Sequence, residues 1–595
     1  MRTDGYAPLR DYAAIGDGRT VALVARDGAI DWLCFPAHDS PTVFGALLDP
    51  ENGGRWTFAP TEPYDVERRY IPETNVLETT FKTANGTVRM TDAMGMQDGG
   101  LPPWVELVRK AEGLSGSVPM AWSVEPRFGY GQAETTLELR EGTPVATDGR
   151  DAIAISSWDA GEPTVGNGAI RGERDLRGGE TALLAMSGVR ESPIHFQPRD
   201  GVELRLEGTI AAWRRWLQGH GVYEGPWKEA VLRSLLVLKL LIHTPTGAIT
   251  AAATTSVPER IGGDKNYDYR YAWVRDSAFT LDALLRLGYH EQAHESFTCL
   301  LGALESTHPR VQPIYTITGD LLTEERQLDL PGYRKSRPVR VGNDAADQLQ
   351  LGGYGALLAT TWHYVRDGNV LDERTGRQLA EVVDLLTRTW RNEDSGIWEL
   401  PETRAYTQSR IAAWEAFDRA LALAAKGQVP DTNAHAWRRT ADEIRTWIDE
   451  NCWSEERGTY TMYPGSDALD ASCLLAARIE FGEPDDERNL RTMDTLRREL
   501  GRGPLLYRYT GMPEEEGAFV PCSFWLVESL ARAGRQNEAA ELMDELLALG
   551  NDVGLFSEQI DPGSGEFLGN FPQGLSHLSL VNAAVNCEGS PSGAG

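Results

Sequence analysis

Two glutamates, Glu399 and Glu558, lie in short segments between amphipathic helical stretches, next to aromatic or hydrogen-bonding residues. Glu399 ends the sequence Gly-Ile-Trp-Glu, and Glu558 lies in Ser-Glu-Gln-Ile-Asp. A carboxylic acid and a carboxylate that face each other across a pocket are the minimal machinery for cleaving a glycosidic bond. Either glutamate taken alone is more simply explained as an exposed loop residue, so the hypothesis requires a fold that brings the two together.

The neighbours of each glutamate suggest how its protonation could be controlled. Trp398 precedes Glu399, and an indole beside a carboxyl can exclude water and raise the carboxyl pKa, as a general acid near neutral pH requires. Ser557 and Gln559 flank Glu558 and could hold a water molecule against its ionised carboxylate. These neighbours are therefore compatible with an acid at Glu399 and a water-activating base at Glu558.

A third segment, Asn266-Tyr-Asp-Tyr-Arg-Tyr-Ala-Trp-Val-Arg-Asp276, is dense in rings and charges. Arg275 offers a planar fork of donors and Asp276 a pair of acceptor oxygens, which together suit the vicinal hydroxyls of a sugar. Trp273 offers a flat apolar face to sugar C–H groups. Residue types alone favour a plainer explanation, in which Asp276 caps a helix and forms a structural ion pair with Arg275.

The first third of the chain has the pattern of an antiparallel β-sandwich. Two-residue turn signals, Asp27-Gly28 and Asn85-Gly86, each separate two short apolar runs and predict β-hairpins. Further strands are expected at 104–108, 118–124, 136–139 and 152–155. Short strands at this spacing predict a sandwich of about 200 residues.

From Ala211 onward the apolar residues recur at helical spacing. Twelve helical segments follow with almost no strand between them, which is the number that an (α/α)6 barrel of six helical hairpins requires. A solenoid is the alternative, but no repeat period is visible. We therefore predict an N-terminal β-sandwich over 1–210, a linker over 211–225 and a catalytic barrel over 226–590. The longest connections, at 244–273, 307–343, 501–517 and 552–573, are expected to carry the chemistry.

Composition limits the possible partners. The 595 residues carry a net charge of −30, which argues against a nucleic acid or an anionic membrane as a partner, because phosphates are bound by clustered Lys and Arg. Six cysteines form no C-x-x-C pair, so neither a zinc ribbon nor a redox motif is supported. The N-terminus has no apolar h-region, so a cytoplasmic location is expected. No metal or organic cofactor is expected.

These segments together resemble glycoside hydrolase family 15, the glucoamylase family, in its bacterial glucoamylase and trehalase-like branch. The resemblance runs through nearly the whole chain in order. It covers Asp11-Tyr-Ala-Ala-Ile-Gly-Asp, Asp27-Gly-Ala-Ile-Asp-Trp-Leu-Cys, Asp39-Ser-Pro, the 266–276 segment, Ser336-Arg-Pro-Val-Arg-Val-Gly-Asn, Gly396-Ile-Trp-Glu, Cys522-Ser-Phe-Trp-Leu-Val and Leu568-Gly-Asn-Phe-Pro-Gln. It implies the same sandwich and (α/α)6 barrel, and hydrolysis with inversion at the anomeric carbon.

The resemblance also implies roles for individual residues. Glu399 matches the general acid and Glu558 the general base, with carboxyl groups expected about 6.5–9.5 Å apart to leave room for water. Arg275 and Asp276 match the pair that grips the non-reducing terminal glucose. The other matched positions are aromatic walls at Trp273 and Trp398, and Glu516 in a loop that faces the pocket.

The expected activity is exo-hydrolysis of short α-gluco-oligosaccharides, of the isomaltose or malto type, with release of β-glucose. The alternative is an α,α-trehalase, although Gln348-Leu-Gln350 looks more like the glucoamylase members. Gly352 and Thr316 depart from common residues of relatives near the expected rim and leave the second-sugar preference open. Phosphorolysis is a second class, disfavoured because it needs no base such as Glu558, and a non-catalytic sugar sensor is a third.

Overall fold

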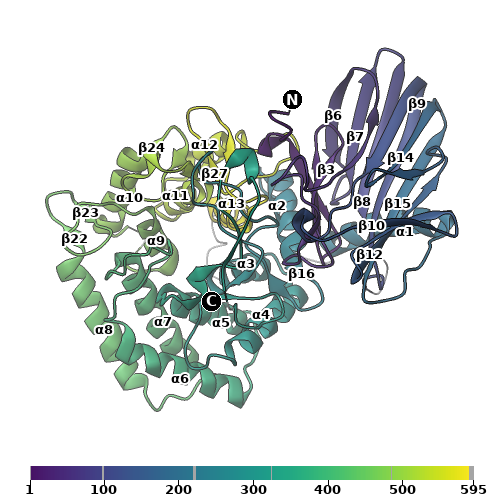
Figure 1. Cartoon of the computed structure of the whole chain (residues 1–595). Coiled ribbons are helices and arrows are strands. Elements are labelled where there is room, and N and C mark those ends of the chain that lie inside the picture. Colours follow the sequence, from purple (N-terminus) through teal and green to yellow (C-terminus); the bar gives the residue numbers. More distant parts are fainter. Residues whose placement is uncertain are drawn as a thin grey trace.

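The computed structural model describes residues 2–588, except 97–99, 219, 220, 222, 323 and 484. It has a β-rich part formed by the first 190 residues and a helical part formed by the remainder (Figure 1). No helix in the described part of the chain is long and apolar enough to cross a membrane.

Fifteen described strands form one antiparallel sheet system. The two predicted hairpins are confirmed, because β2 pairs with β3 and β7 pairs with β8. The strands are β1 Tyr12–Gly16, β2 Val21–Ala25, β3 Ile30–Cys34, β4 Thr42–Phe44, β5 Trp56–Pro60, β6 Tyr64–Tyr70, β7 Leu77–Thr83, β8 Gly86–Met94, β9 Val105–Val124, β10 Thr136–Arg140, β11 Thr143–Thr147, β12 Asp151–Trp158, β13 Thr164–Gly166, β14 Ala169–Arg177 and β15 Thr181–Arg190.

Strand β9 holds the two layers of this sheet together. Its first half pairs with β8 and β15, and its second half pairs with β5 and β14. The prediction of two separate strands at 104–108 and 118–124 is therefore wrong. The polar stretch between them is part of the strand because β8 pairs with residues up to Gly116 and β14 pairs from Ser117 onward, so the ladder continues without a gap.

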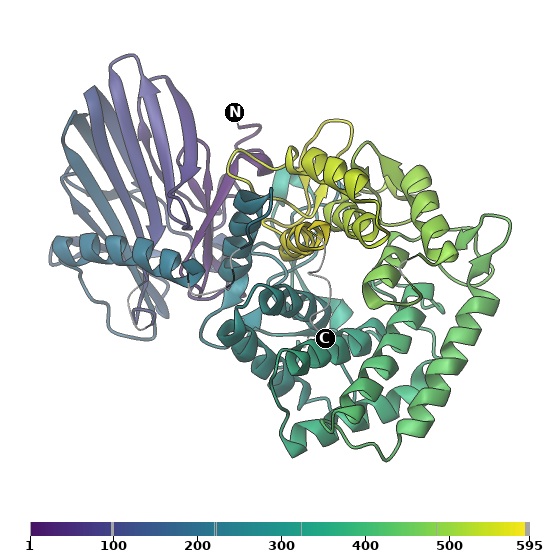
Figure 2. The same cartoon turned by 180° about the vertical axis from the view of Figure 1, so that it is seen from behind.

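Helix α1, Arg199–Gln218, lies along the sheet (Figure 2). The Thr209 hydroxyl accepts a hydrogen bond from the Met96 amide, and Arg205 pairs with the buried Glu106 of β9. The helical region therefore begins at Arg199 rather than at Ala211, and α1 extends into the predicted 211–225 linker. The division into domains at these boundaries stays a prediction.

The twelve predicted helical segments are all present as helices α2 to α13. Inner helices α3, α5, α7, α9, α11 and α13 contact one another in turn, and α13 closes the ring against α3 (Figures 1 and 2). Outer helix α6 buries one stripe, whereas inner helix α11 is buried almost throughout, as its apolar sequence dictates. The helices are α2 Lys228–Leu241, α3 Val274–Arg286, α4 His290–Leu304, α5 Gly352–Arg366, α6 Glu373–Thr389, α7 Thr407–Ala425, α8 Ala434–Asn451, α9 Leu475–Ile479, α10 Glu487–Leu500, α11 Val520–Arg532, α12 Gln536–Leu547 and α13 Gly574–Cys587.

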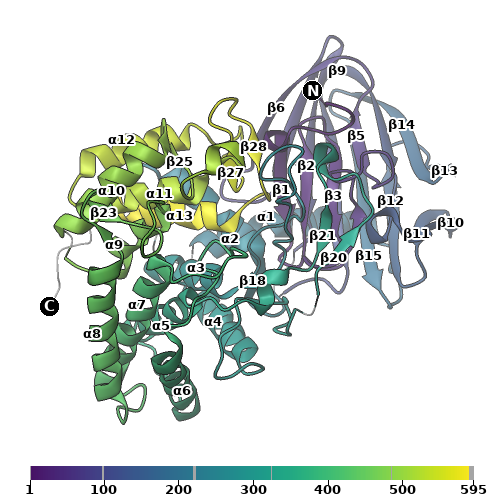
Figure 3. The ribbon, with the colours of Figure 1, turned by 60° about the vertical axis from the view of Figure 1, so that its left-hand side comes forward.

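The sheet supports the segment that leads into α3 (Figure 3). Arg270 is fully buried, pairs with Asp268 at 2.6 Å and donates a hydrogen bond to the Ser40 carbonyl. The Trp32 indole of β3 donates a hydrogen bond to the Ala253 carbonyl at 2.8 Å. The Arg270 contact fixes the ring-rich 266–276 segment against the β-rich part, and the Trp32 bond ties Ala253 to the same part.

We expect Asp268→Asn to lower the free energy of unfolding by about 3–5 kcal/mol, because it leaves Arg270 charged and buried without its carboxylate. Urea unfolding followed by tryptophan fluorescence measures this loss. Glu67→Gln is the matched control, since the exposed Glu67–Lys82 pair contributes about 0–1 kcal/mol. Equal losses in the two variants would contradict the anchoring role.

Candidate active site

A pocket of about 470 Å³ lies at the end of the barrel where the inner helices begin. Glu399 and Glu558 both line it, so the fold brings together the two glutamates that the sequence singled out. Four other predicted residues, Arg275, Asp276, Trp273 and Trp398, also line it. The remaining lining residues are Ala251, Tyr269, Ile397, Arg508, Phe519, Trp525, Gln573 and Leu575.

Glu399 lies in the connection between α6 and α7 and has a left-handed backbone conformation, with φ of 58°. This conformation is unfavourable for a residue other than glycine and persists only where the surroundings impose it. Here the Gln348 amide donates to the Glu399 carbonyl, and the Trp273 indole donates to its carboxyl Oε1 at 2.7 Å. The carboxyl is thereby held at one position in the pocket.

Burial raises the pKa of Glu399, and the nearby Arg275 and the Trp273 hydrogen bond oppose that effect without cancelling it. The indole that contacts the Glu399 carboxyl is that of Trp273. The adjacent Trp398 donates instead to Asp470 at 2.8 Å and packs edge-on against Phe519. The direct contact to the Glu399 carboxyl thus comes from Trp273 rather than from Trp398, and the role of Glu399 as proton donor stays a prediction.

Glu558, only 1% exposed, immediately precedes strand β27 (Gln559–Ile560). The Asn570 amide donates to its Oε2 at 3.1 Å, and the Tyr269 hydroxyl donates to the same carboxyl group. Gly569 has a φ of 71°, and a Cβ there would lie 2.4 Å from Glu558 Oε2. Glycine at position 569 is therefore required by the close approach of the backbone to this carboxylate.

The predicted water contact of Ser557 is not what the structure shows. Its hydroxyl donates to the Gln559 carbonyl at 2.7 Å, and neither Ser557 nor Gln559 lines the pocket. The pocket groups next to Glu558 are instead Tyr269 and Arg508. Sequence reasoning missed Arg508, although it lies in one of the long connections that were expected to carry chemistry.

Arg508 is held by two buried carboxyl groups. Its Nε donates to Glu516 Oε1 at 2.6 Å, and its Nη2 donates to Glu259. Glu516 was predicted to contact substrate, but it does not line the pocket and instead positions Arg508 from behind. Glu516 therefore reaches the pocket only through the Arg508 guanidinium, and its predicted contact with substrate stays a prediction.

The two carboxyl groups that hold Arg508 have opposite pKa shifts. Burial raises the pKa of Glu259 well above its ordinary value, whereas for Glu516 burial is outweighed by Arg508, which lowers its pKa. Lys265, 3.3 Å from Glu516, adds to that preference. Glu259 is accordingly the neutral acid and Glu516 the carboxylate. Burial raises the pKa of Glu558 to about 7, although Arg508 and the hydrogen bond from the Asn570 amide oppose that rise.

Arg275 and Asp276 occupy the first turn of α3 and form an ion pair at 3.0 Å. Arg275 also donates to the Ile397 carbonyl at 2.8 Å, which ties α3 to the Glu399 connection. Both side chains line the pocket. The structural ion pair and the sugar-binding pair are thus compatible descriptions of the same two residues.

The two positions that depart from relatives lie elsewhere. Gly352 lines a neighbouring cavity, and Thr316 lies beside a separate small cavity next to α4. Neither residue lines the catalytic pocket, so they give no physical basis for choosing the second sugar.

Comparison with known proteins identifies the family. Residues 225–585 match the model described as glycosyl hydrolases family 15, and residues 3–158 match the model described as trehalase-like, N-terminal. The chain belongs to glycosyl hydrolase family 15. This family 15 protein is a glycoside hydrolase, and the predicted family resemblance is confirmed.

Similar proteins span the whole chain. It is 34% identical to a trehalase of Thermoplasma volcanium, over 99% of this chain and 95% of that protein. It is also 34% identical to a trehalase of Mycobacterium tuberculosis, over 98% of this chain and 90% of the other. A crystal structure of a bacterial glucoamylase complexed with acarbose superposes with a TM-score of 0.73 at 15% identity, covering 99% of this chain and 95% of that one, which confirms the β-plus-barrel fold.

We expect Glu259→Gln to leave the acidic limb of the kcat/KM–pH profile unmoved, because it replaces one neutral group by another. Activity falls as pH decreases through the pKa of the base, so this limb reports the charge around Glu558. Glu515→Gln, at the exposed neighbour of Glu516 that also pairs with Lys265, is the matched control. A shift of about one pH unit or more in Glu259→Gln alone would mean that both buried carboxyls are ionised.

Proposed function

We propose that this family 15 hydrolase is an α,α-trehalase. The observation that carries the proposal is full-length similarity to proteins named trehalase, which includes the N-terminal β-rich part. The comparisons therefore favour the alternative substrate over the isomaltose-type or malto-oligosaccharides expected first from the sequence.

The Gln348-Leu-Gln350 motif, which favoured the glucoamylase members, has a structural explanation. Gln350 donates to the side chain of Gln348, and Gln348 donates to the Glu399 carbonyl. These two amides support the strained backbone of Glu399, whichever sugar lies beyond it. The motif consequently carries little weight in choosing between substrates.

Substrate binding uses the walls and the floor of the pocket. A terminal α-glucosyl unit is gripped at its hydroxyls by Arg275 and Asp276, and Trp273 and Trp398 cover its apolar faces. The hydrogen bond from Arg275 to Ile397 closes the floor. A floored pocket suits removal of one glucosyl unit from the end of a short saccharide and excludes threading of a long chain.

Hydrolysis needs one proton delivered and one removed. Glu399 donates its proton to the glycosidic oxygen as the bond from that oxygen to the anomeric carbon breaks. A water molecule attacks the opposite face of the same carbon and passes a proton to Glu558. The glucosyl carbon inverts to β-glucose, the second glucose leaves with its own anomeric bond untouched, and the two glutamates exchange protonation states. Arg508 helps to keep Glu558 ionised.

The cysteines bear on the location of the enzyme, and Glu558 bears on the competing phosphorolysis reaction. All six cysteines are free thiols, which suits the reducing cytoplasm that we propose for the enzyme. Phosphorolysis is disfavoured because a phosphate nucleophile needs no base at Glu558.

The test is a comparison of initial rates on trehalose, maltose and isomaltose, with and without inorganic phosphate. We expect the highest kcat/KM on trehalose, glucose as the product with no glucose 1-phosphate, and about 100- to 10,000-fold loss of kcat in Glu558→Gln. Faster turnover of maltose or isomaltose would replace the trehalase proposal. Phosphate-dependent glucose 1-phosphate would replace hydrolysis itself.

A further inference from the structure

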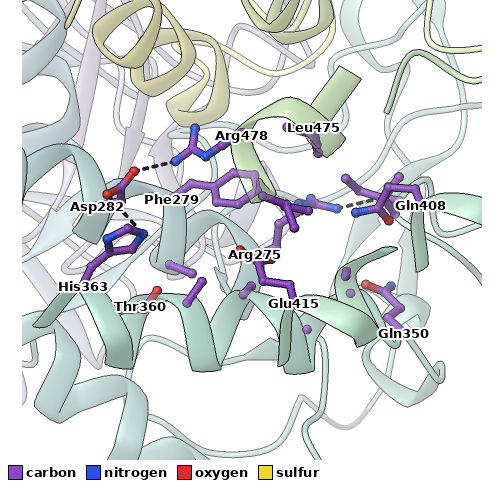
Figure 4. A pocket seen from close by; sticks show the side chains of 18 of the residues that line it. Arg275, Phe279, Asp282, Gln350, Thr360, His363, Gln408, Glu415, Leu475 and Arg478 are labelled. Atoms are coloured by element: carbon purple, nitrogen blue, oxygen red, sulfur yellow. Dashed lines mark hydrogen bonds and ion pairs between the residues drawn. The ribbon is translucent and has the colours of Figure 1, made fainter. Parts of the chain in front are cut away.

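A second cavity, here called the inner chamber, lies inside the barrel behind the catalytic pocket. Its volume is about 750 Å³, and helices α3, α5, α7 and α9 supply most of its walls (Figure 4). Arg275 and Ile397 line both the inner chamber and the catalytic pocket, so they form the partition between them. The chamber extends from this partition to Arg286 in the last turn of α3.

Small residues on α5 create this space. Gly352, Gly353, Ala356 and Thr360 face the chamber at helical spacing. A Cβ added to either glycine would lie at least 3.4 Å from any neighbour, whereas one at Gly355 would lie 2.4 Å from a backbone oxygen of α7. Gly355 thus serves close helix packing, while the residues that face the chamber leave volume that a packed interior would normally fill.

The charged groups of the chamber already have partners. Arg275 pairs with Asp276, and both Arg286 and Arg478 pair with Asp282, at 3.0 and 2.8 Å respectively. Burial lowers the pKa of His363 to about 4, so this imidazole is neutral near pH 7. No lining cation in the described chain is left to bind an anion, so the chamber favours a neutral ligand.

Two residues that line the chamber, Gln408 and His363, each have a buried polar atom without a hydrogen-bond partner among the described residues. Gln408 is only 5% exposed, and its Oε1 accepts no hydrogen bond from the described residues. The Nδ1 of His363 also has no hydrogen-bond partner among them. Glu415 is 9% exposed, and burial raises its pKa to about 8, which makes it a neutral donor and acceptor. Buried polar groups normally have hydrogen-bond partners, so these three match a ligand rich in hydroxyls.

Apolar surface completes the chamber. The Phe279 ring, with Arg478 over it at 4.5 Å, and the side chains of Leu475 and Ile479 lie beside the polar groups. We propose that the inner chamber is a second binding site for a neutral polyhydroxylated molecule of hexose size. This site goes beyond the catalytic pocket and does not depend on which disaccharide is hydrolysed there.

Crystals soaked in D-glucose test the site directly. We expect one glucose in the inner chamber, hydrogen-bonded to Gln408 and Glu415, in addition to glucose in the catalytic pocket. Equilibrium dialysis with labelled D-glucose should give one bound molecule per chain more than the catalytic pocket holds in these crystals. Water alone in the chamber while glucose occupies the catalytic pocket, or no bound molecule beyond those in the catalytic pocket, would overturn the proposal.

Ala356→Leu should fill the chamber and reduce the number of bound glucose molecules per chain by one, with the glucose in the catalytic pocket retained. Ala425→Leu, the same change at an exposed position of α7, should leave that number unchanged. If circular dichroism shows that Ala356→Leu does not fold, Gln408→Leu removes the unpartnered oxygen at similar size and should weaken chamber binding at least tenfold. Unchanged chamber occupancy in the folded variant would overturn the assignment.

Discussion

The catalytic pocket depends on keeping carboxyl groups buried while controlling which of them carry protons. Glu399, Glu558, Glu259 and Glu516 all lie at one end of the barrel, where removal from water raises a carboxyl pKa. A single guanidinium, that of Arg508, opposes this effect for three of them. Burial thus raises the pKa of both Glu399 and Glu558, so the acid and base roles proposed for them rest on the family resemblance and on their shared pocket.

The scaffold supplies those partners from segments that are distant in sequence. Trp273 and Tyr269 come from the segment that the β-rich part anchors through Arg270, and they reach Glu399 and Glu558 respectively. A glycine at 569 allows the backbone to approach Glu558. The sandwich is therefore part of the catalytic architecture, because it fixes the segment that holds both carboxyls.

Periodicity and turn chemistry were sufficient to predict most of the fold. The Asp27-Gly28 and Asn85-Gly86 turns marked two real hairpins, and twelve apolar helical patterns corresponded to α2–α13. Strand β9 was split because its polar middle is stabilised by neighbours far away in sequence. Helix α1 was missed upstream of Ala211, where its charged sequence packs only one narrow face on the sheet.

The candidate site was predictable only where a motif surrounded the residue. Glu399 and Glu558 stood out by their flanking aromatic and polar residues and by family resemblance. Arg508 and Glu259 carry no local signal, since their importance comes from a three-residue contact across the barrel end. Glu516 was identified by its loop, but its burial behind Arg508 is a tertiary property.

The central claim is that an acid and a base act on opposite faces of one glucosyl ring. The anomeric composition of the first product tests this claim most directly. In a proton NMR time course on trehalose, recorded before mutarotation, inversion predicts equal amounts of α- and β-glucose. Early spectra that contain α-glucose alone would show retention and would contradict the assignment of Glu558 as the base that activates water.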